Sequence, residues 1–249
     1  MSTSTTHFGY KQVATDEKIK LVGEVFKSVA SSYDVMNDLM SLGLHRLWKR
    51  YFALTAGLKP GMRVLDLAGG TGDIAALALK QVAPSGQVVL TDINPAMLNV
   101  GRKRLLDQGH LQGLDFSLTN AEALPFPDEC FDVVTIAFGL RNVTDKDRAL
   151  REMKRVLKLG GRALVLEFSE LKVAALKPLY DRYSFAVLPR LGKLIANDSA
   201  SYQYLAESIR KHPNQAELAE RFTEAGFQRV SVRNLSLGLV AIHSGYRLD

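Results

Sequence analysis

Apolar and polar residues alternate along the chain in two spacings, which predicts strands and helices in turn. Five short apolar runs have the length and composition of buried strands: 63–67, 87–91, 114–118, 130–138 and 162–168. Three segments between them place apolar side chains at helical spacing: 74–81, 95–108 and 145–157. This alternation predicts an α/β fold with a doubly wound, mostly parallel sheet.

The pattern also suggests how the chain is divided. Residues 1–15 are predicted to be a flexible tail, and 16–55 a helical cap with apolar residues on one face. Residues 56–249 form the α/β core in this interpretation. Within it, 169–212 interrupts the alternation and is rich in Leu, Tyr and Lys, which predicts helical pieces packed over the sheet.

The end of the chain predicts a different strand connection. A helix at 215–225 precedes two apolar runs, 230–235 and 239–246, which are joined by a short turn. Two strands with so short a link are typical of an antiparallel hairpin. We therefore expect a seven-stranded sheet that is closed by an antiparallel hairpin.

Composition indicates the cellular compartment of the protein. The 249 residues include one cysteine, Cys130, which excludes an intrachain disulfide and is typical of a reducing compartment such as the cytoplasm. Residues 1–12 lack the apolar core of a signal peptide, and no apolar run is long enough to span a bilayer. We therefore expect any membrane contact to be peripheral, on the inner face.

Charge and histidine spacing narrow the choice of partners. The net charge of +6 and the pI near 9.4 permit binding to anionic membranes or nucleic acid. The chain lacks dense basic tracts interleaved with aromatic residues, so we expect no nucleic-acid partner. The five histidines have no metal-ligand spacing, so we expect no metal.

The run from Val64 to Asp73 carries the strongest chemical signal. An apolar strand leads into a glycine-rich turn at 70–72 that opens a helix, an arrangement that holds part of a nucleotide-like ligand. Asp66 and Asp73 flank the glycines, so we expect them to repel a pyrophosphate and attract a ligand with an ammonium and a sulfonium group. This favours S-adenosylmethionine over NAD, whose binding pattern residues 70–75 also fit.

Each residue of this turn has an expected role. Gly70 and Gly72 allow close approach of the backbone to a ligand and a positive φ. Thr71 offers a hydroxyl and a backbone N–H to a carboxylate. Asp66 ends the first strand, where open α/β sheets bind ligands, and we assign it to the ammonium group. Alone, Asp66 would also fit a structural carboxylate.

Two further strand ends complete the predicted pocket. Asp92 lies 20 residues after Gly72, a spacing that suits an acid bonded to both ribose hydroxyls. Asn120 and Ala121 follow the third strand, and we expect Asn120 to hold the adenine edge. Asp92 alone would also suit a helix N-cap, although Asn94 is the better cap.

Several runs are closely similar to the ubiquinone/menaquinone biosynthesis C-methyltransferases of the UbiE type. They are 28–41, 43–50, 121–127, 138–145, 204–210 and the His212-Pro213 step. The resemblance extends from about Thr6 to Tyr246, and the Phe-Gly-Leu-Arg-Asn-Val run from Phe138 is specific to the family. Two departures are Ala68, where many class I methyltransferases have Gly, and Ala137, where some relatives have Ser.

The resemblance implies a class I S-adenosylmethionine-dependent methyltransferase. It implies methyl transfer to a ring carbon of a prenylated quinol, either demethylmenaquinol or 2-polyprenyl-6-methoxy-1,4-benzoquinol, without a metal. Implied partners are a quinone-biosynthesis complex or a second copy of the chain, and a membrane surface touched peripherally. Two alternatives stay open: another small lipophilic phenol as acceptor, or an NAD-binding oxidoreductase.

Four residues are candidates for the catalytic step. Arg141 and Asn142 follow the fourth strand; arginine stays protonated, so it would stabilise a phenolate or orient a water, and Asn142 would fix the quinol hydroxyl. A salt bridge with Asp145 is the alternative for Arg141. His45 and Tyr33 are acid/base candidates from the cap. Their alternatives are a surface histidine and a packing aromatic.

Overall fold

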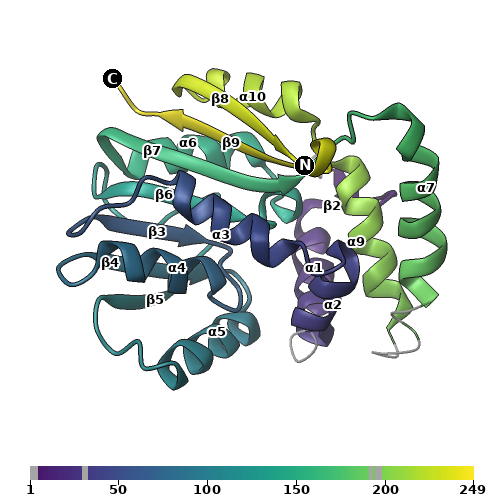
Figure 1. Cartoon of the computed structure of the whole chain (residues 1–249), viewed down its shortest axis with the longest axis horizontal. Coiled ribbons are helices and arrows are strands. Elements are labelled where there is room, and N and C mark those ends of the chain that lie inside the picture. Colours follow the sequence, from purple (N-terminus) through teal and green to yellow (C-terminus); the bar gives the residue numbers. More distant parts are fainter. Residues whose placement is uncertain (1–4, 30–32, 191–192, 194–197) are drawn as a thin grey trace.

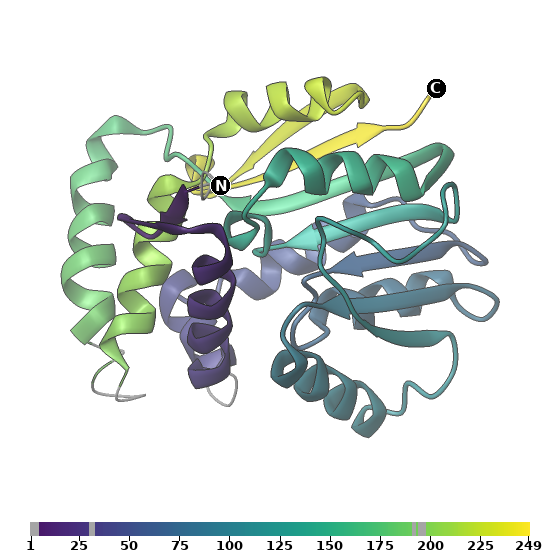
Figure 2. The ribbon, with the colours of Figure 1, turned by 180° about the vertical axis from the view of Figure 1, so that it is seen from behind.

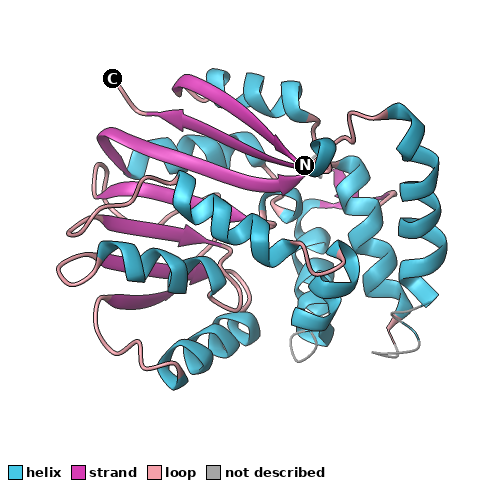
Figure 3. Cartoon of the chain, in the orientation of Figure 1, coloured by secondary structure: helices cyan, strands magenta, loops and turns pink. Residues whose placement is uncertain are grey.

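The computed structural model describes residues 5–29, 33–190, 193 and 198–249, and its centre is a seven-stranded sheet (Figure 1). The strand order is β5-β4-β3-β6-β7-β9-β8, with β9 antiparallel to β7 and β8 and the other pairs parallel. The strands are β3 (Arg63–Leu67), β4 (Gln87–Asp92), β5 (Leu114–Leu118), β6 (Phe131–Ala137), β7 (Leu157–Phe168), β8 (Gln228–Leu235) and β9 (Val240–Tyr246). The predicted doubly wound sheet and its closing hairpin are confirmed (Figure 3).

Helices cover both faces of this sheet. On the face seen in Figure 1 lie α3 (His45–Thr55) and α4 (Asp73–Val82). On the face seen in Figure 2 lie α6 (Lys146–Val156) and α10 (Gln215–Glu224). The fifth helix of the core, α5 (Pro95–Asp107), packs beside β4 and β5.

Neighbouring residues of the central strands point to opposite faces, so each strand contributes to two cores. Val64 packs with residues of α3 and α4, whereas Leu65 packs with residues of α6 and α10. Leu164 and Val165 of β7 divide in the same way. Burying such a side chain stabilises the fold by about 1.5–3 kcal/mol. Coverage on both faces is why these runs are almost continuously apolar.

One strand begins earlier than the sequence predicts. β7 was expected at 162–168, after a break at Gly160 and Gly161, but it starts at Leu157. Its pairing with β6 jumps from Phe131↔Leu157 to Val133↔Arg162, so an irregularity in the ladder absorbs the extra residues. The glycines that suggest a break therefore lie within this irregularity.

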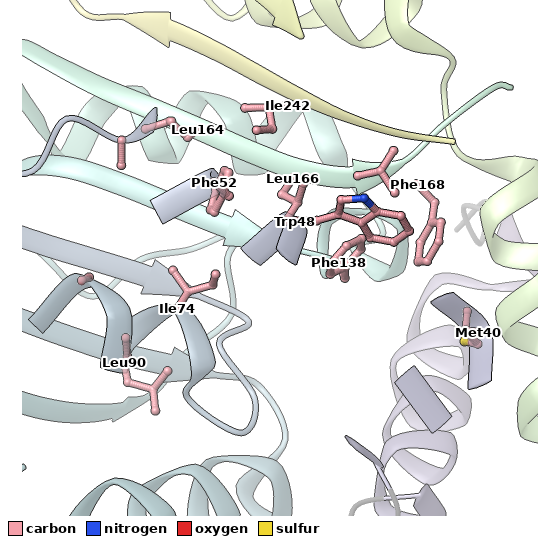
Figure 4. Close-up of a cluster of buried hydrophobic side chains, with 14 of the residues drawn as sticks. Met40, Trp48, Phe52, Ile74, Leu90, Phe138, Leu164, Leu166, Phe168 and Ile242 are labelled. Carbon is pink, nitrogen blue, oxygen red and sulfur yellow. The ribbon is translucent and has the colours of Figure 1, made fainter. Parts of the chain in front are cut away.

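Trp48 fastens α3 to the carboxyl edge of the sheet (Figure 4). Its ring lies edge-on to the Phe168 ring, with the two ring centroids 6.1 Å apart. Its ring centroid lies 6.3 Å from that of Phe138. The indole Nε1 donates to Ser236 Oγ at 2.9 Å, in the turn between β8 and β9. The N-terminal part of the chain is thereby held to the turn between the last two strands.

The remaining helices gather beyond this edge, at the right of Figure 1. They are α1 (Thr15–Val29), α2 (Tyr33–Ser41), α7 (Lys177–Arg182), which continues through a π-helical turn at Tyr183–Val187, and α9 (Ser199–Lys211). No helix in the described ranges is long and apolar enough to cross a membrane.

Residues 5–14 correct the expected tail. β1 (Thr5–Phe8) and β2 (Lys11–Ala14) form an antiparallel hairpin that rests on α9. Phe8 stacks on Tyr204 with ring centroids 4.2 Å apart, and the Tyr10 N–H donates to Glu207, 197 positions later. Contacts with so distant a segment leave no local signal. The rest of the predicted tail, 1–4, lies outside the described residues.

Asn94 joins α1 to α5, and the expected N-cap is confirmed. Its Oδ1 accepts from the N–H groups of Ala96 at 2.9 Å and Met97 at 3.4 Å. Its Nδ2 donates to Gly23 O of α1 at 3.1 Å. One side chain thus fixes the start of α5 and holds α1 over the carboxyl edge of the sheet.

We expect Asn94→Ala to lower the free energy of unfolding by about 1–2 kcal/mol, because the cap and the bond to α1 are both lost. Asn94→Asp keeps the cap oxygen and loses only the donor to Gly23, so its loss should be smaller. Urea denaturation measures both. An Asn94→Ala protein as stable as the parent would contradict this role.

Candidate functional site

The main pocket opens at the carboxyl ends of β3, β4, β5 and β6. The chain reverses its direction of travel across the sheet between β3 and β6, and open α/β sheets bind ligands at this point. The hollow contains about 840 Å³ of empty space, solvent at its mouth included. Five predicted residues line it: Gly70, Asp92, Asn120, Ala121 and Asn142.

The glycine turn has the predicted backbone, but its two glycines do different things. Gly70 has φ of 53° and lines the pocket. Gly72 has φ of 82° and precedes α4; a Cβ there would lie 2.7 Å from Leu105 Cδ1, so close packing with α5 requires glycine. Gly72 does not line the pocket. Ala68, where many class I methyltransferases have Gly, also lies in the left-handed region, with φ of 47°.

Asp92 ties the end of β4 to the glycine turn. Its Oδ2 accepts from Gly70 N–H at 3.0 Å and its Oδ1 from Asn94 N–H at 2.8 Å. Burial raises the pKa of Asp92 to about 6, although these N–H groups favour the charged form. A carboxylate has about four acceptor positions, so ribose hydroxyls can still bond to it.

Asp66 and Thr71 line a smaller cavity beside the main pocket, and Ala68 lines both. Asp66 is fully buried; its Oδ1 accepts from the Thr135 hydroxyl at 2.8 Å, and its Oδ2 has no hydrogen-bond partner among the described residues. Burial raises the pKa of Asp66 to about 7. An orphaned carboxylate oxygen at this position fits a cationic group.

Asp73 does not act as the second free acid that the sequence suggests. Its carboxylate pairs with Lys49 Nζ at 2.7 Å and Arg104 Nη2 at 3.0 Å. Burial opposes the charged form, but these cations hold the pKa of Asp73 below its usual value. The expected repulsion of a pyrophosphate by two unpaired acids was wrong, because one of them is neutralised.

Arg141 shapes the turn after β6 and does not line the main pocket. Its Nη1 donates to Glu167 Oε1 at 2.7 Å and to Phe138 O at 2.6 Å, and its backbone N–H donates to Glu167 Oε2 at 3.2 Å. Both members of the pair are buried. The alternative salt bridge with Asp145 is wrong, since Asp145 caps α6 by accepting from Arg148 N–H.

Asn142 ends this turn (η2, Leu140–Asn142) and faces the main pocket. Its Oδ1 accepts from the Tyr204 hydroxyl at 3.0 Å. The pKa of Tyr204 is raised by burial, so its hydroxyl keeps its proton and remains a donor. This bond orients the amide and leaves its Nδ2 group as the donor for a ligand.

Of the two candidates from the cap, His45 is not brought to the main pocket. His45 is buried, contrary to the surface alternative, with Nε2 2.9 Å from Asp38 Oδ1. Burial lowers the pKa of His45 despite that carboxylate, so the ring is neutral near pH 7. Tyr33 begins α2, and its side chain lies outside the described part of the chain.

Sequence reasoning missed the residues that cover the pocket. Ile19, Val22 and Phe26 of α1 line it from above, and Phe138 and Val143 line it beyond β6. The amphipathic pattern of 16–29 was a signal for a buried face, although it did not say what that face covers. In the described ranges, no group of three or more His, Cys, Asp or Glu is arranged to hold a metal ion.

The strand order, the antiparallel last strand and the pocket at the switch point define a methyltransferase fold of the doubly wound class. A SAM-dependent methyltransferase from Aquifex aeolicus has a TM-score of 0.61 at 19% identity, over 85% of this chain and 96% of that chain. A SAM-dependent, possible histamine N-methyltransferase from Thermotoga maritima has a TM-score of 0.63 at 21% identity, over 90% and 98%. Identities this low concern the fold alone.

Sequence relatives identify the family. The model of the ubiE/COQ5 methyltransferase family matches residues 11–247. Ubiquinone/menaquinone biosynthesis C-methyltransferase UbiE of Stenotrophomonas maltophilia (strain R551-3) is 65% identical over 99% of this chain and 97% of its own length. The protein of the same name from Xanthomonas oryzae pv. oryzae (strain MAFF 311018) is 64% identical over 99% and 98%. The chain belongs to the ubiE/COQ5 methyltransferase family, which confirms the resemblance and sets aside the oxidoreductase alternative.

Breaking the Arg141–Glu167 pair from either side should be costly. We expect Glu167→Ala and Arg141→Met each to lower the free energy of unfolding by about 3–5 kcal/mol, because a buried charge is left unpaired. Lys177→Ala removes an exposed pair with Glu170 and should cost about 1 kcal/mol or less. Chemical denaturation compares them; a Glu167→Ala loss as small as the control would mean that the pair is not structural.

Asp66 should make stability depend on pH. Burial raises its pKa from 3.8 to about 7, so the unfolded chain loses this proton first as pH rises, and the Asp66 contribution to stability falls between pH 4 and 8. Across this pH range, the free energy of unfolding of the native protein should fall relative to that of Asp66→Asn. The fall should be about 1.4 kcal/mol for each unit by which the folded and unfolded pKa values of Asp66 differ. The titration of Asp92 contributes equally to both proteins, so it cancels in the difference between them. Urea denaturation at pH 4, 6 and 8 that gave a constant difference would refute the shift.

Proposed function

We propose that this protein transfers the methyl group of S-adenosylmethionine to a ring carbon of a prenylated quinol in ubiquinone and menaquinone biosynthesis. The observation that carries the proposal is 65% identity over 99% of the chain to a protein named for this C-methylation. The pocket at the switch point, with a ribose-type acid beside a glycine turn, supports it.

The residues around the two cavities fit the methyl donor. Asp92 would bond the ribose, with Asn120 and Ala121 beside the adenine. Asp66 would accept from the ammonium group through its orphaned Oδ2, and Thr71 would donate to the carboxylate. The donor supplies a methyl group that its positive sulfur already activates for attack by carbon.

The acceptor side of the main pocket is apolar with one polar contact. Phe138, Val143 and residues of α1 would enclose the quinol ring and exclude water. Asn142 Nδ2 would donate to a ring oxygen and fix which carbon faces the methyl group. Holding the reactants in line in this way contributes up to about 7–11 kcal/mol to catalysis.

Arg141 acts as a positioning residue in this proposal. Its pair with Glu167 holds the turn that presents Asn142. His45 and Tyr33 remain proposals for proton transfer. His45 would need to act through solvent or through a movement of the cap.

An exposed face of the cap supports peripheral contact with a membrane, where a prenylated quinol resides. Leu42, Leu47 and Leu54 are exposed apolar residues near α3, and Arg46 and Arg50 are exposed beside them. Apolar side chains interspersed with basic ones suit the surface of an anionic bilayer.

A second exposed apolar group supports contact with another protein. Leu179, Phe185 and Val187, on α7 and its π-helical extension, are exposed in the helical insertion at 169–212. We infer that this part of the insertion meets a second copy of the chain or another enzyme of quinone biosynthesis.

Asp92→Asn should weaken binding of S-adenosylmethionine about 10- to 100-fold, the loss expected for a hydrogen bond to a charged group. The amide keeps one acceptor for the backbone, so the turn should survive. Asp107→Asn, at the exposed end of α5, is the matched control and should bind normally. Calorimetry measures all three, and equal affinities would remove Asp92 from the donor site.

The function is tested with defined quinols. Purified protein and S-adenosylmethionine should add one methyl group to demethylmenaquinol or to 2-polyprenyl-6-methoxy-1,4-benzoquinol, detected by mass spectrometry. A strain lacking the gene should accumulate the unmethylated quinones. Normal quinone pools in that strain would contradict the proposal, as would methylation only of unprenylated phenols.

A further inference from the structure

A second pocket lies next to the main one and is strongly basic. It is bounded by β1, α1, the start of α6 and the end of α9, and Glu122 and Thr144 line both pockets. The cationic residues that line it are Lys18, Arg141, Lys146, Arg148, Lys211 and Arg221.

The acids of this second pocket already have partners. Glu122 accepts from Thr144 N–H at 3.0 Å, and Asp145 accepts from Arg148 N–H at 2.9 Å. Asp147 holds Arg221 through both carboxylate oxygens, at 2.6 and 2.8 Å. Arg141 is paired with Glu167, and the charge of Glu122 acts on Lys18. No carboxylate of the described chain lies within ion-pair distance of Lys18, Lys146, Arg148 or Lys211.

Lys18 is the least expected of these cations, because it is only 4% exposed. Its ammonium donates to Val143 O at 3.3 Å, and no ion pair joins it to any acid of the described chain. Buried lysines are normally paired with a carboxylate or another anion. A neutral carbonyl at this distance is a weak substitute.

Lys146 approaches the same carbonyl. Its Nζ donates to Val143 O at 3.0 Å, so two ammonium groups share one neutral oxygen. Burial, and then the charges of Lys18 and Arg221, lower the pKa of Lys146 to about 8. Each ammonium has three N–H donors and uses one on Val143, so two remain on each.

His212 lies close to the cations of this pocket. It is buried, and neither ring nitrogen has a hydrogen-bond partner in the described structure. Burial and the nearby charges of Lys146 and Arg141 hold its pKa well below the usual value, so the ring adds no charge.

We propose that this second pocket is a binding site for a phosphate-class oxyanion, held by the ammonium groups of Lys18 and Lys146. Such an anion offers several acceptor oxygens to the donors that Val143 leaves unused. It would join α1, which covers the main pocket, to the turn that carries Val143 and Thr144. Its source would be a free phosphate or diphosphate, or the headgroup of an acidic lipid.

Isothermal titration with inorganic phosphate and with pyrophosphate, at fixed ionic strength set by sodium chloride, tests the site on the full chain. We expect saturable binding that is about tenfold weaker in Lys18→Met and in Lys146→Met, the loss for one charge-assisted hydrogen bond. Lys18→Arg should retain binding. Lys20→Met on α1 and Arg151→Met on α6 remove exposed charges from the same helices and should bind normally.

Flotation with phosphatidylcholine vesicles that contain phosphatidic acid distinguishes the source. Vesicle binding that is lost in Lys18→Met and Lys146→Met but kept in the controls supports a lipid headgroup; saturable binding of the free anions alone supports a soluble phosphate. Both methionine variants lose a buried charge and should fold, which near-ultraviolet circular dichroism verifies. The proposal is overturned if neither probe binds, or if the control variants weaken binding as much as the pocket variants.

Discussion

The site depends on one hydrogen bond, from Gly70 N–H to Asp92 Oδ2 at 3.0 Å. It joins the turns that follow β3 and β4 and so fixes the glycine turn against the acid of the neighbouring strand. Gly101 lets α5 close on the same turn, since a Cβ there would lie 2.3 Å from Gly70 O. The proposed donor site is therefore built from backbone geometry at the centre of a sheet whose strands are buried on both faces.

Local sequence patterns predicted the features that neighbouring residues determine. Apolar runs gave the strands, and turn residues at their ends gave Gly70, Asp92 and Asn120, because parallel strands bring their carboxyl ends to one edge. Partners that approach from other elements could not be predicted. Asp73 is paired with Lys49 of α3, Arg141 is paired with Glu167 of β7, and the hairpin of β1 and β2 contacts α9. The periodicity of the sequence does not indicate such contacts.

The proposed roles place three tasks around one edge of the sheet. The smaller cavity at Asp66 would hold the charged end of the methyl donor, and the mostly apolar hollow under α1 would hold the quinol ring. The basic pocket lies beyond Thr144, with Lys18 on the same helix that covers the hollow. Since α1 borders both pockets, a ligand in either pocket would affect the position of α1.

The most direct test of the donor site is the number of protons exchanged when S-adenosylmethionine binds at pH 7. Calorimetry in buffers of different ionisation enthalpy measures it. Pairing an ammonium with Asp66, whose pKa is about 7 in the free protein, should release about half a proton more from the native protein than from Asp66→Asn. Equal proton exchange in the two proteins, with both binding the donor, would show that Asp66 does not hold the ammonium group.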